Sequence, residues 1–267
     1  MPQLFGTAGI RGNIRTKVTP ILAFRLGAAL STHLGNSGRV LVGRDNRTSS
    51  EMLSAALASG LNFGGCDAFL AGVVPTPVLA YHTRGRGMDA GVMITASHNP
   101  PSDNGLKCFT KDGMEYPPAE EEELERIITE KAYRGVPWRS IGKAIQLHRL
   151  KEEYVEAVLS RVGTVRRRLR VVVDCGNGAT SKVTPTLLRR MGCRVIALND
   201  HLDGFFPGRP LEPTPENLTT LSRVVREVGA DLGIAHDGDG DRGLQVHLLD
   251  RGEGDHPVGC LLYTSPS

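Results

Sequence analysis

The chain has 267 residues, of which 40% are hydrophobic and 23% are charged, and its formal net charge is +3 at pH 7. This composition excludes a wholly disordered or collagen-like chain, the charge is too small to favour a nucleic-acid-binding protein, and the length suits one or two domains. No apolar run approaches the roughly 20 residues of a membrane helix, and residues 1–11 lack the features of a secretory signal. We therefore expect a cytoplasmic protein that binds neither nucleic acid nor a membrane.

The apolar pattern along the chain alternates between strand and helix periodicity. Strands are predicted at 39–43, 67–74 and 90–95, with helices at 49–62 and 117–132. Residues 133–142 contain Gly135, Pro137 and Trp138 and are predicted to be a linker. A second block then carries a helix at 150–159, strands at 169–173, 194–198 and 231–235, and helices at 180–191 and 215–228. Alternation of this kind indicates largely parallel sheets with crossover helices, in two α/β units that divide near residue 145.

The cysteines show no metal-binding or disulfide pattern. There are five of them, an odd number, and no pair has the CxxC spacing. Buried free thiols are therefore predicted for Cys66, Cys108, Cys175, Cys193 and Cys260.

The segment Thr95–Ala–Ser97–His98–Asn99–Pro100–Pro101 follows a predicted strand and is stopped by two prolines. It is expected in a loop at the carboxyl end of that strand, where open α/β sheets bind ligands. A serine held there can act as a nucleophile, although serine, asparagine and proline are equally typical of a plain turn. The segment is not a G-x-S-x-G elbow, because Thr95 and Asn99 stand at the glycine positions.

The segment Asp237–Gly–Asp239–Gly–Asp241–Arg242 follows the last predicted strand. Three carboxylates at alternate positions, separated by glycines, can turn onto one hard cation, and ligands that are all oxygen suit Mg²⁺. An EF-hand loop does not fit, because Arg242 and Leu248 occupy its glycine and glutamate positions. A solvated acidic turn is the alternative, but packing three like charges without a cation is costly.

Three further segments carry weaker signals. In the segment Gly6–Gly12, glycines lie on both sides of Arg11. Such a loop could bring the guanidinium to a phosphate, and a flexible turn is the alternative. Lys107, in the segment Asn104–Lys107, is a candidate phosphate ligand or acid–base group, although most lysines are simply solvated. Asp174–Gly178 has part of a dinucleotide fingerprint, but Ser181 replaces the third glycine, which favours a tight strand-to-helix turn over NAD binding.

Together these segments resemble the α-D-phosphohexomutase family, which includes phosphoglucomutase and phosphomannomutase. The resemblance runs from Phe5 to about Gly243 and includes two further segments, Gly43–Ser49 and Phe206–Asn217. Its most specific sequence motifs are TASHNP and DGDGDR. It implies two tandem three-layer α/β/α units with mixed, largely parallel sheets. The expected boundaries are 1–145 for the unit with the serine loop, 146–259 for the unit with the acidic loop, and 260–267 for a non-native tail.

The resemblance also implies roles for individual residues. Ser97 would be the phosphoserine, and Asp237, Asp239 and Asp241 would hold Mg²⁺ together with its phosphate. The other residues expected at the reaction centre are Arg11, His98, Lys107 and Arg242. A hexose 1-phosphate would become a hexose 6-phosphate through a hexose 1,6-bisphosphate that turns around in the site. Lys107 is the candidate for taking the proton from the sugar hydroxyl.

The expected substrates are glucose and mannose phosphates, with phosphoglucosamine mutase as the alternative. Ala8 stands where the glucosamine branch carries an acid, and the opening resembles archaeal-type phosphoglucomutase/phosphomannomutases. The GEMSGH-type sugar loop and the arginine–serine–glycine loop of the family's third and fourth domains are not in the sequence, so the chain is expected to be an inactive fragment. The octapeptide Cys260–Ser267 resembles a translated transposase adapter from sequencing libraries, so the native part is expected to end near Gly259.

Two other hypotheses stay open. A short protein could bind a sugar phosphate or Mg²⁺ without turnover, and a phosphatase would result if water reached a phosphoserine. The sequence leaves the oligomeric state undetermined.

Overall fold

The computed structural model describes residues 4–6, 8–246 and 262–264. By its contacts the chain divides into two compact units, residues 1–96 with 101–150, and residues 97–100 with 151–267. The boundary expected at 145/146 stays a prediction. Among the described residues, no helix combines the length and the apolar character needed to cross a bilayer.

The first unit is built on a six-stranded sheet whose strand order is β1-β5-β4-β2-β3-β6. The strands β4, β2, β3 and β6 run parallel, whereas β5 pairs antiparallel with both β4 and β1. Its strands are β1 (Ile10–Asn13), β2 (Gly38–Arg44), β3 (Cys66–Val73), β4 (Ala90–Ile94), β5 (Asp103–Thr110) and β6 (Ala144–Gln146). Its helices are α1 (Pro20–His33), α2 (Ser50–Phe63), α3 (Thr76–Gly85) and α4 (Pro118–Thr129), with a 3-10 turn at Trp138–Ser140.

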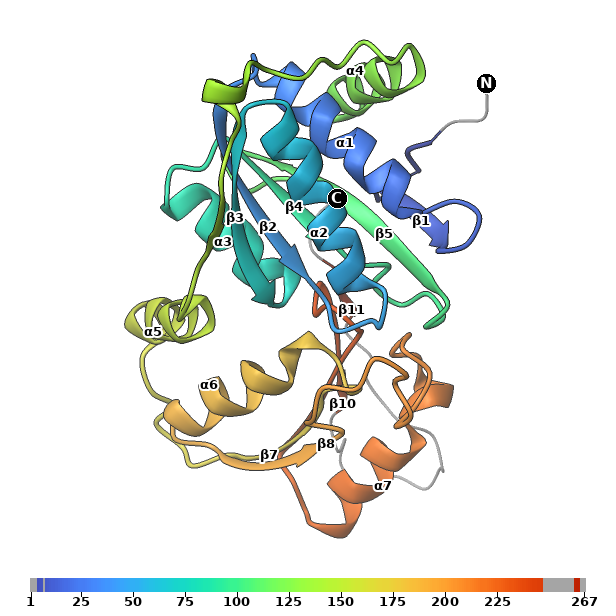
Figure 1. Cartoon of the computed structure of the whole chain (residues 1–267). Coiled ribbons are helices and arrows are strands. Elements are labelled where there is room, and N and C mark those ends of the chain that lie inside the picture. The colour runs from blue at the N-terminus through green and yellow to red at the C-terminus, as the bar shows by residue number, and fades with distance from the viewer. Residues whose placement is uncertain (1–3, 7, 247–261, 265–267) are drawn as a thin grey trace. The chain divides into compact units, whose positions relative to one another are not determined.

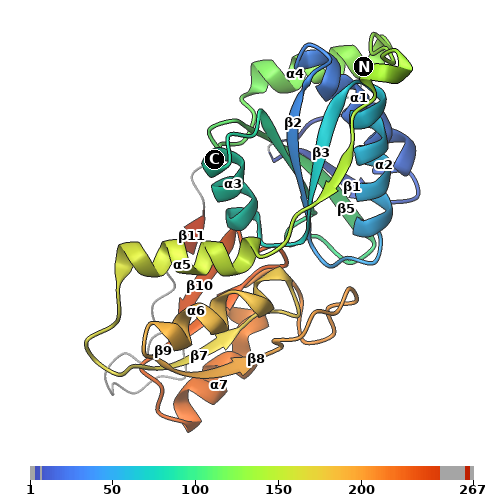
Figure 2. The same ribbon diagram turned by 60° about the vertical axis from the view of Figure 1, so that its left-hand side comes forward.

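Helices cover both faces of this sheet, and Figure 2 shows α1 and α2 on one side with α3 on the other. On the first side, Val40, Val42 and Val92 pack into one core with leucines of α1 and α2. A Cβ on Gly43, one residue further along β2, would meet Leu79 of α3 at 2.8 Å, so the opposite face is closely covered as well. Burial on both faces explains why the strands are continuous apolar runs rather than alternating ones.

Helices α1 and α2 approach each other closely at two glycines. A Cβ on Gly27 would lie 2.4 Å from the carbonyl oxygen of Leu57, and one on Gly60 would lie 2.1 Å from that of Phe24. Any side chain there would force the helices apart, and each leucine buried between them contributes roughly 1.5–3 kcal/mol. The start of α1 is capped by the Thr19 hydroxyl, which accepts a hydrogen bond from Leu22 N.

The second unit has a five-stranded sheet in the order β11-β10-β9-β7-β8. The strands β9, β7 and β8 are parallel, and β10 pairs antiparallel with β9 and β11. Its strands are β7 (Arg170–Asp174), β8 (Arg194–Leu198), β9 (Leu232–His236), β10 (Arg242–Val246) and β11 (Leu262–Thr264). Helices α5 (Leu150–Val162), α6 (Thr184–Arg190) and α7 (Thr219–Glu227) accompany 3-10 turns at Ala179–Lys182 and Pro215–Leu218. Figures 1 and 2 show α6 and α7 on opposite faces of this sheet.

The fold class expected from the sequence is confirmed: both units are α/β with mixed, largely parallel sheets. Several elements differ in detail. Residues 133–142 are not a free linker but run along the first unit, where Val136 N donates to Phe63 O and Gly142 N to Asn62 O. The helices expected at 180–191 and 215–228 each begin as a 3-10 turn.

The free-thiol prediction is confirmed for four cysteines, Cys66, Cys108, Cys175 and Cys193, which are buried and unbridged. Burial raises the pKa of the Cys175 thiol to about 12, which keeps it protonated and unreactive at neutral pH. Cys260 lies outside the described residues, as does most of the segment expected to be a non-native tail.

Candidate active site

The acidic motif forms the loop between β9 and β10 in the second unit. Asp237 and Asp239 are fully buried and Asp241 is half-buried. One carboxylate oxygen from each residue lies within 4.8 Å of the other two. Gly240 has φ +74°, a conformation that would be strained for a residue with a side chain, so this glycine allows the turn that brings the third carboxylate back to the first two.

Ser97 lies against this loop. Its hydroxyl donates a hydrogen bond to Asp237 Oδ2 and lies 3.3 Å from Asp241 Oδ1, and residues 97–100 group with the second unit by their contacts. The His98 ring Nδ1 is 3.4 Å from Ser97 Oγ. A Cβ on Gly238 would lie 2.8 Å from Ser97 O, so the glycine permits this close approach. The serine and the acidic motif, 140 residues apart, therefore meet as one cluster.

The backbone at Ser97 is unusual. Its φ is +53°, in the left-handed region that costs a non-glycine residue of order 1 kcal/mol or more. The side chain is nevertheless fully buried. Strained, over-determined residues of this kind gather at functional sites, which favours the functional hypothesis for this loop over the plain turn.

The electrostatics of the loop are dominated by its like charges. Burial, followed by repulsion from Asp239 and Asp241, raises the pKa of Asp237 well above 3.8. Burial lowers the pKa of the preceding residue, His236, to about 4, so its imidazole is neutral at pH 7 and supplies no compensating charge. Two backbone N–H groups, those of Gly240 and Arg242, donate to Asp237 Oδ1 at 3.0 and 3.3 Å.

This donor set fits a small, hard divalent cation. Three carboxylates and one hydroxyl oxygen are ligands that Mg²⁺ accepts, and a cation among them removes the repulsion that raises the Asp237 pKa. Ligands at about 2.1 Å from one ion lie at most about 4.2 Å apart. The three oxygens lie within 4.8 Å of one another, which is close to that span.

The other residues expected at the reaction centre are divided between the two units. Arg242 opens β10 in the second unit, where its guanidinium is 3.7 Å from Glu212 Oε1. Lys107 and Arg11 belong to the first unit, on the neighbouring strands β5 and β1. Lys107 is almost completely buried, with Nζ 3.6 Å from Glu115 Oε1, and Arg11 donates from Nε to Ala8 O at 3.2 Å. Arg11 thus lies in a paired strand rather than in the expected loop.

Two polar networks near the strand ends could not be found from the sequence motifs. In the first unit, Asp45 accepts hydrogen bonds from the side chains of Arg47, Ser50 and Thr95. In the second unit, Asp174 and Arg209 form a buried ion pair at 3.0 Å. Asp45 and Asp174 each come just after a predicted strand, and this position is the one feature of the sequence that could have marked them as candidate site residues. Their partners lie up to 50 residues away, which no local pattern encodes.

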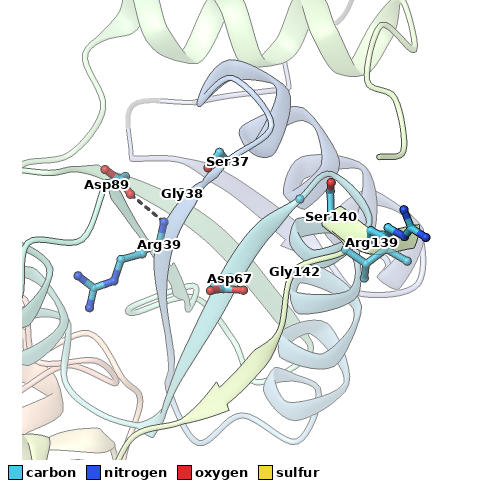
Figure 3. Close-up of a pocket in the computed structure, with 10 residues that line it drawn as sticks. Ser37, Gly38, Arg39, Asp67, Asp89, Arg139, Ser140 and Gly142 are labelled. Atoms are coloured by element: carbon cyan, nitrogen blue, oxygen red, sulfur yellow. Dashed lines mark hydrogen bonds between the residues drawn. The ribbon is translucent and has the colours of Figure 1, made fainter. Parts of the chain in front are cut away.

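A separate hollow of about 410 Å³ lies in the first unit, where β2, β3 and β4 begin (Figure 3). Its two carboxylates are engaged with the backbone: Asp89 Oδ2 accepts from Arg39 N and Asp67 Oδ1 from Lys143 N, both at 2.7 Å. Ligands of open α/β sheets bind at the carboxyl ends of the strands. We therefore place the candidate site at the acidic loop and not in this hollow.

The fold and the cluster define a protein of two α/β units in which a buried serine hydroxyl contacts two members of a cluster of three carboxylates. The family models for phosphoglucomutase/phosphomannomutase, alpha/beta/alpha domains I and II, match residues 2–134 and 152–247. The chain belongs to this family.

Relatives and solved structures agree with that assignment. The chain is 50% identical over 245 residues to a "probable phosphoglucosamine mutase" of Methanothermobacter thermautotrophicus, covering 92% of this chain and 54% of that protein. It is also 50% identical over 240 residues to a phosphopentomutase of Thermococcus kodakarensis, covering 90% and 52%. A phosphoglucomutase/phosphomannomutase family structure from Burkholderia thailandensis superposes with a TM-score of 0.82 at 31% identity, over 92% of this chain and 54% of that one. The chain spans about half the length of the curated relatives it matches.

Proposed function

We propose that this chain supplies the phosphoserine and the metal site of a phosphosugar mutase. The observation that carries the proposal is the contact of the Ser97 hydroxyl with Asp237 and Asp241, within a family whose named members are mutases. Asp237, Asp239 and Asp241 would hold Mg²⁺. When bound, the cation would neutralise charge on the phosphoryl group that is transferred.

In this proposal the residues of the chain do three things. Asp237 Oδ2 accepts the hydrogen bond of Ser97 and so fixes the direction of Oγ, which attacks the phosphorus of a sugar bisphosphate. The bond from that phosphorus to the sugar oxygen breaks, and the proton that the serine hydroxyl loses ends on that sugar oxygen, so the products are phosphoserine and a sugar monophosphate with a free hydroxyl. Burial of the serine and of two of the acids keeps bulk water from the phosphoserine, which supports a mutase over a phosphatase.

For the sugar, we propose glucosamine phosphate rather than glucose or mannose phosphate. Several relatives with 43–50% identity carry the name phosphoglucosamine mutase, and this outweighs the argument from Ala8. A pentose phosphate is the second candidate, because the phosphopentomutase is 50% identical as well.

The test uses the protein as its gene encodes it. The purified protein is assayed with the 1-phosphates of glucosamine, glucose, mannose and ribose, with Mg²⁺ and the matching bisphosphate present. We expect the highest kcat/KM for glucosamine 1-phosphate and loss of nearly all turnover in Ser97→Ala. Ser102→Ala changes an exposed serine five residues away and should be unaffected. Full activity in Ser97→Ala would refute the phosphoserine, and a preference for another sugar would refute the proposed substrate.

A further inference from the structure

The loop that carries the three acids contains two glycines in five residues, and hydrogen bonds from other segments of the second unit restrain its conformation. Glycines leave a backbone free to adopt many conformations, so something must hold the carboxylates together before an ion binds. Two backbone carbonyls of the loop region are hydrogen-bonded to other segments of the second unit. These are His236 O, immediately before Asp237, and Gly238 O, immediately after it.

The first restraint comes from Arg209, in the loop after β8. Its Nη2 donates to His236 O, and its Nε donates to Asp174 Oδ2 at 3.0 Å. The Arg209 and Asp174 side chains are 5% and 2% exposed, so this is a buried pair. Asp174 is itself held, because Oδ1 accepts from Gly176 N at 2.9 Å and from Asn199 Nδ2 at 3.0 Å.

The second restraint comes from the turn after β7. Ala179 N donates to Gly238 O at 3.0 Å. A Cβ on Gly178 would lie 2.5 Å from that same oxygen, so the two backbones touch and position 178 must be glycine. Gly176 has φ +55°, and a Cβ there would lie 3.0 Å from Arg209 Nη2. The turn therefore packs against both the acidic loop and the arginine that restrains it.

We propose that Arg209, anchored by Asp174, is a positioning residue that sets the geometry in which the acidic loop binds a divalent cation. The planar guanidinium bonds the carboxylate and the carbonyl at once, which an ammonium cannot do with the same fixed spacing. This inference rests on the proposed metal site. It gives a role to two stretches, Asp174–Gly178 and Phe206–Asn217, that the proposed chemistry does not itself use.

The experiment measures Mg²⁺ affinity by titration calorimetry and the Mn²⁺ electron paramagnetic resonance spectrum, on the whole chain, below the onset of thermal melting. Arg209→Lys keeps the charge beside Asp174 but loses the two-point contact. We expect the dissociation constant for Mg²⁺ to rise about tenfold or more, within the range of outer-sphere substitutions, and the Mn²⁺ spectrum to change. The double variant Arg209→Met/Asp174→Asn removes both charges and should behave in the same way.

The matched control is Arg167→Met. Arg167 also pairs with an aspartate of the second unit, Asp231, at 3.0 Å, but its side chain is 80% exposed, and Asp231 directly precedes β9 whereas the acidic loop follows that strand. Unchanged Mg²⁺ affinity in Arg209→Lys, or an equal loss in Arg167→Met, would overturn the inference. Failure of the proposed metal site gives a different result, since the unmodified chain would then bind neither ion and Asp239→Asn would change nothing.

Discussion

Replacing Arg47 by methionine should destabilise the first unit strongly. Arg47 and Asp45 are both fully buried, and Arg47 Nε lies 3.0 Å from Asp45 Oδ2. Nη1 of Arg47 also donates to Asp103 O at 3.0 Å. The substitution leaves the Asp45 carboxylate buried with the hydroxyls of Ser50 and Thr95 but without its cation.

The size of this effect follows from the burial of the pair. Removing one partner of a buried ion pair costs about 3–5 kcal/mol, because the remaining charge has lost its compensation. In a unit of this size, 1 kcal/mol corresponds to roughly 2–4 °C in Tm, so we expect Tm to fall by about 10 °C. The assay is thermal unfolding followed by circular dichroism and calorimetry.

Arg44→Met is the matched control for that measurement. Arg44 is three residues away and pairs at 3.3 Å with Glu51, whose side chain is 83% exposed. An exposed pair of this kind contributes less than about 1 kcal/mol, so Tm should change by no more than about 4 °C. If the Tm of Arg47→Met equals that of Arg44→Met, the network around Asp45 does not contribute the expected stability to the unit.

Three further results are expected. Asp239→Asn should raise the dissociation constant for Mg²⁺ at least about tenfold in calorimetry, since it removes a charged ligand, and an unchanged value would refute the metal site. Burial, and repulsion from Glu115, raise the pKa of Glu121 to about 7, from 4.5 in the unfolded chain, so the stability this group contributes is present below about pH 4.5 and lost as the pH rises to 7. Glu121→Gln should therefore raise Tm relative to the unmodified chain more at pH 8 than at pH 5, and equal differences at the two pH values would contradict this. Residues 1–259 alone should not convert sugar 1-phosphates at family-like rates, because the expected loops for the sugar ring and the distal phosphate are absent from the sequence; robust conversion would show that they are dispensable.

Much of the fold could be predicted from the sequence because its strands are continuous β-branched runs. The segments Arg39–Gly43 and Leu169–Val173 were placed correctly on that basis, as β2 and β7. Helix α1 was missed because small and apolar residues surround almost its whole circumference, as packing against α2 and α4 requires, so it has little amphipathic pattern. The strand expected at 67–74 is β3, and α3 begins directly after it, with Pro77 in the first turn, where its missing N–H costs nothing.

The candidate site, like the fold, could be predicted from the sequence only in part. The acidic loop could be predicted because its three ligands are neighbours in sequence, and spacing alone indicates that they can converge. Its restraint by Arg209 could not, because that residue is 27 positions from the carbonyl it binds and the contact depends on where β8 and β9 end in the sheet. The assignment of a sugar also lies beyond local pattern, since relatives with different names are equally similar to this chain.

The most direct test of the central claim is to locate the transferred phosphate. The protein as its gene encodes it is incubated with glucosamine 1,6-bisphosphate and Mg²⁺, digested, and mapped by tandem mass spectrometry, with Ser97→Ala and Ser102→Ala treated identically. We expect one phosphoryl group on Ser97, present in Ser102→Ala, absent in Ser97→Ala, and lost when glucosamine 1-phosphate is added in excess as the acceptor. A phosphoryl group on another residue, or turnover without any phosphate on Ser97, would contradict it.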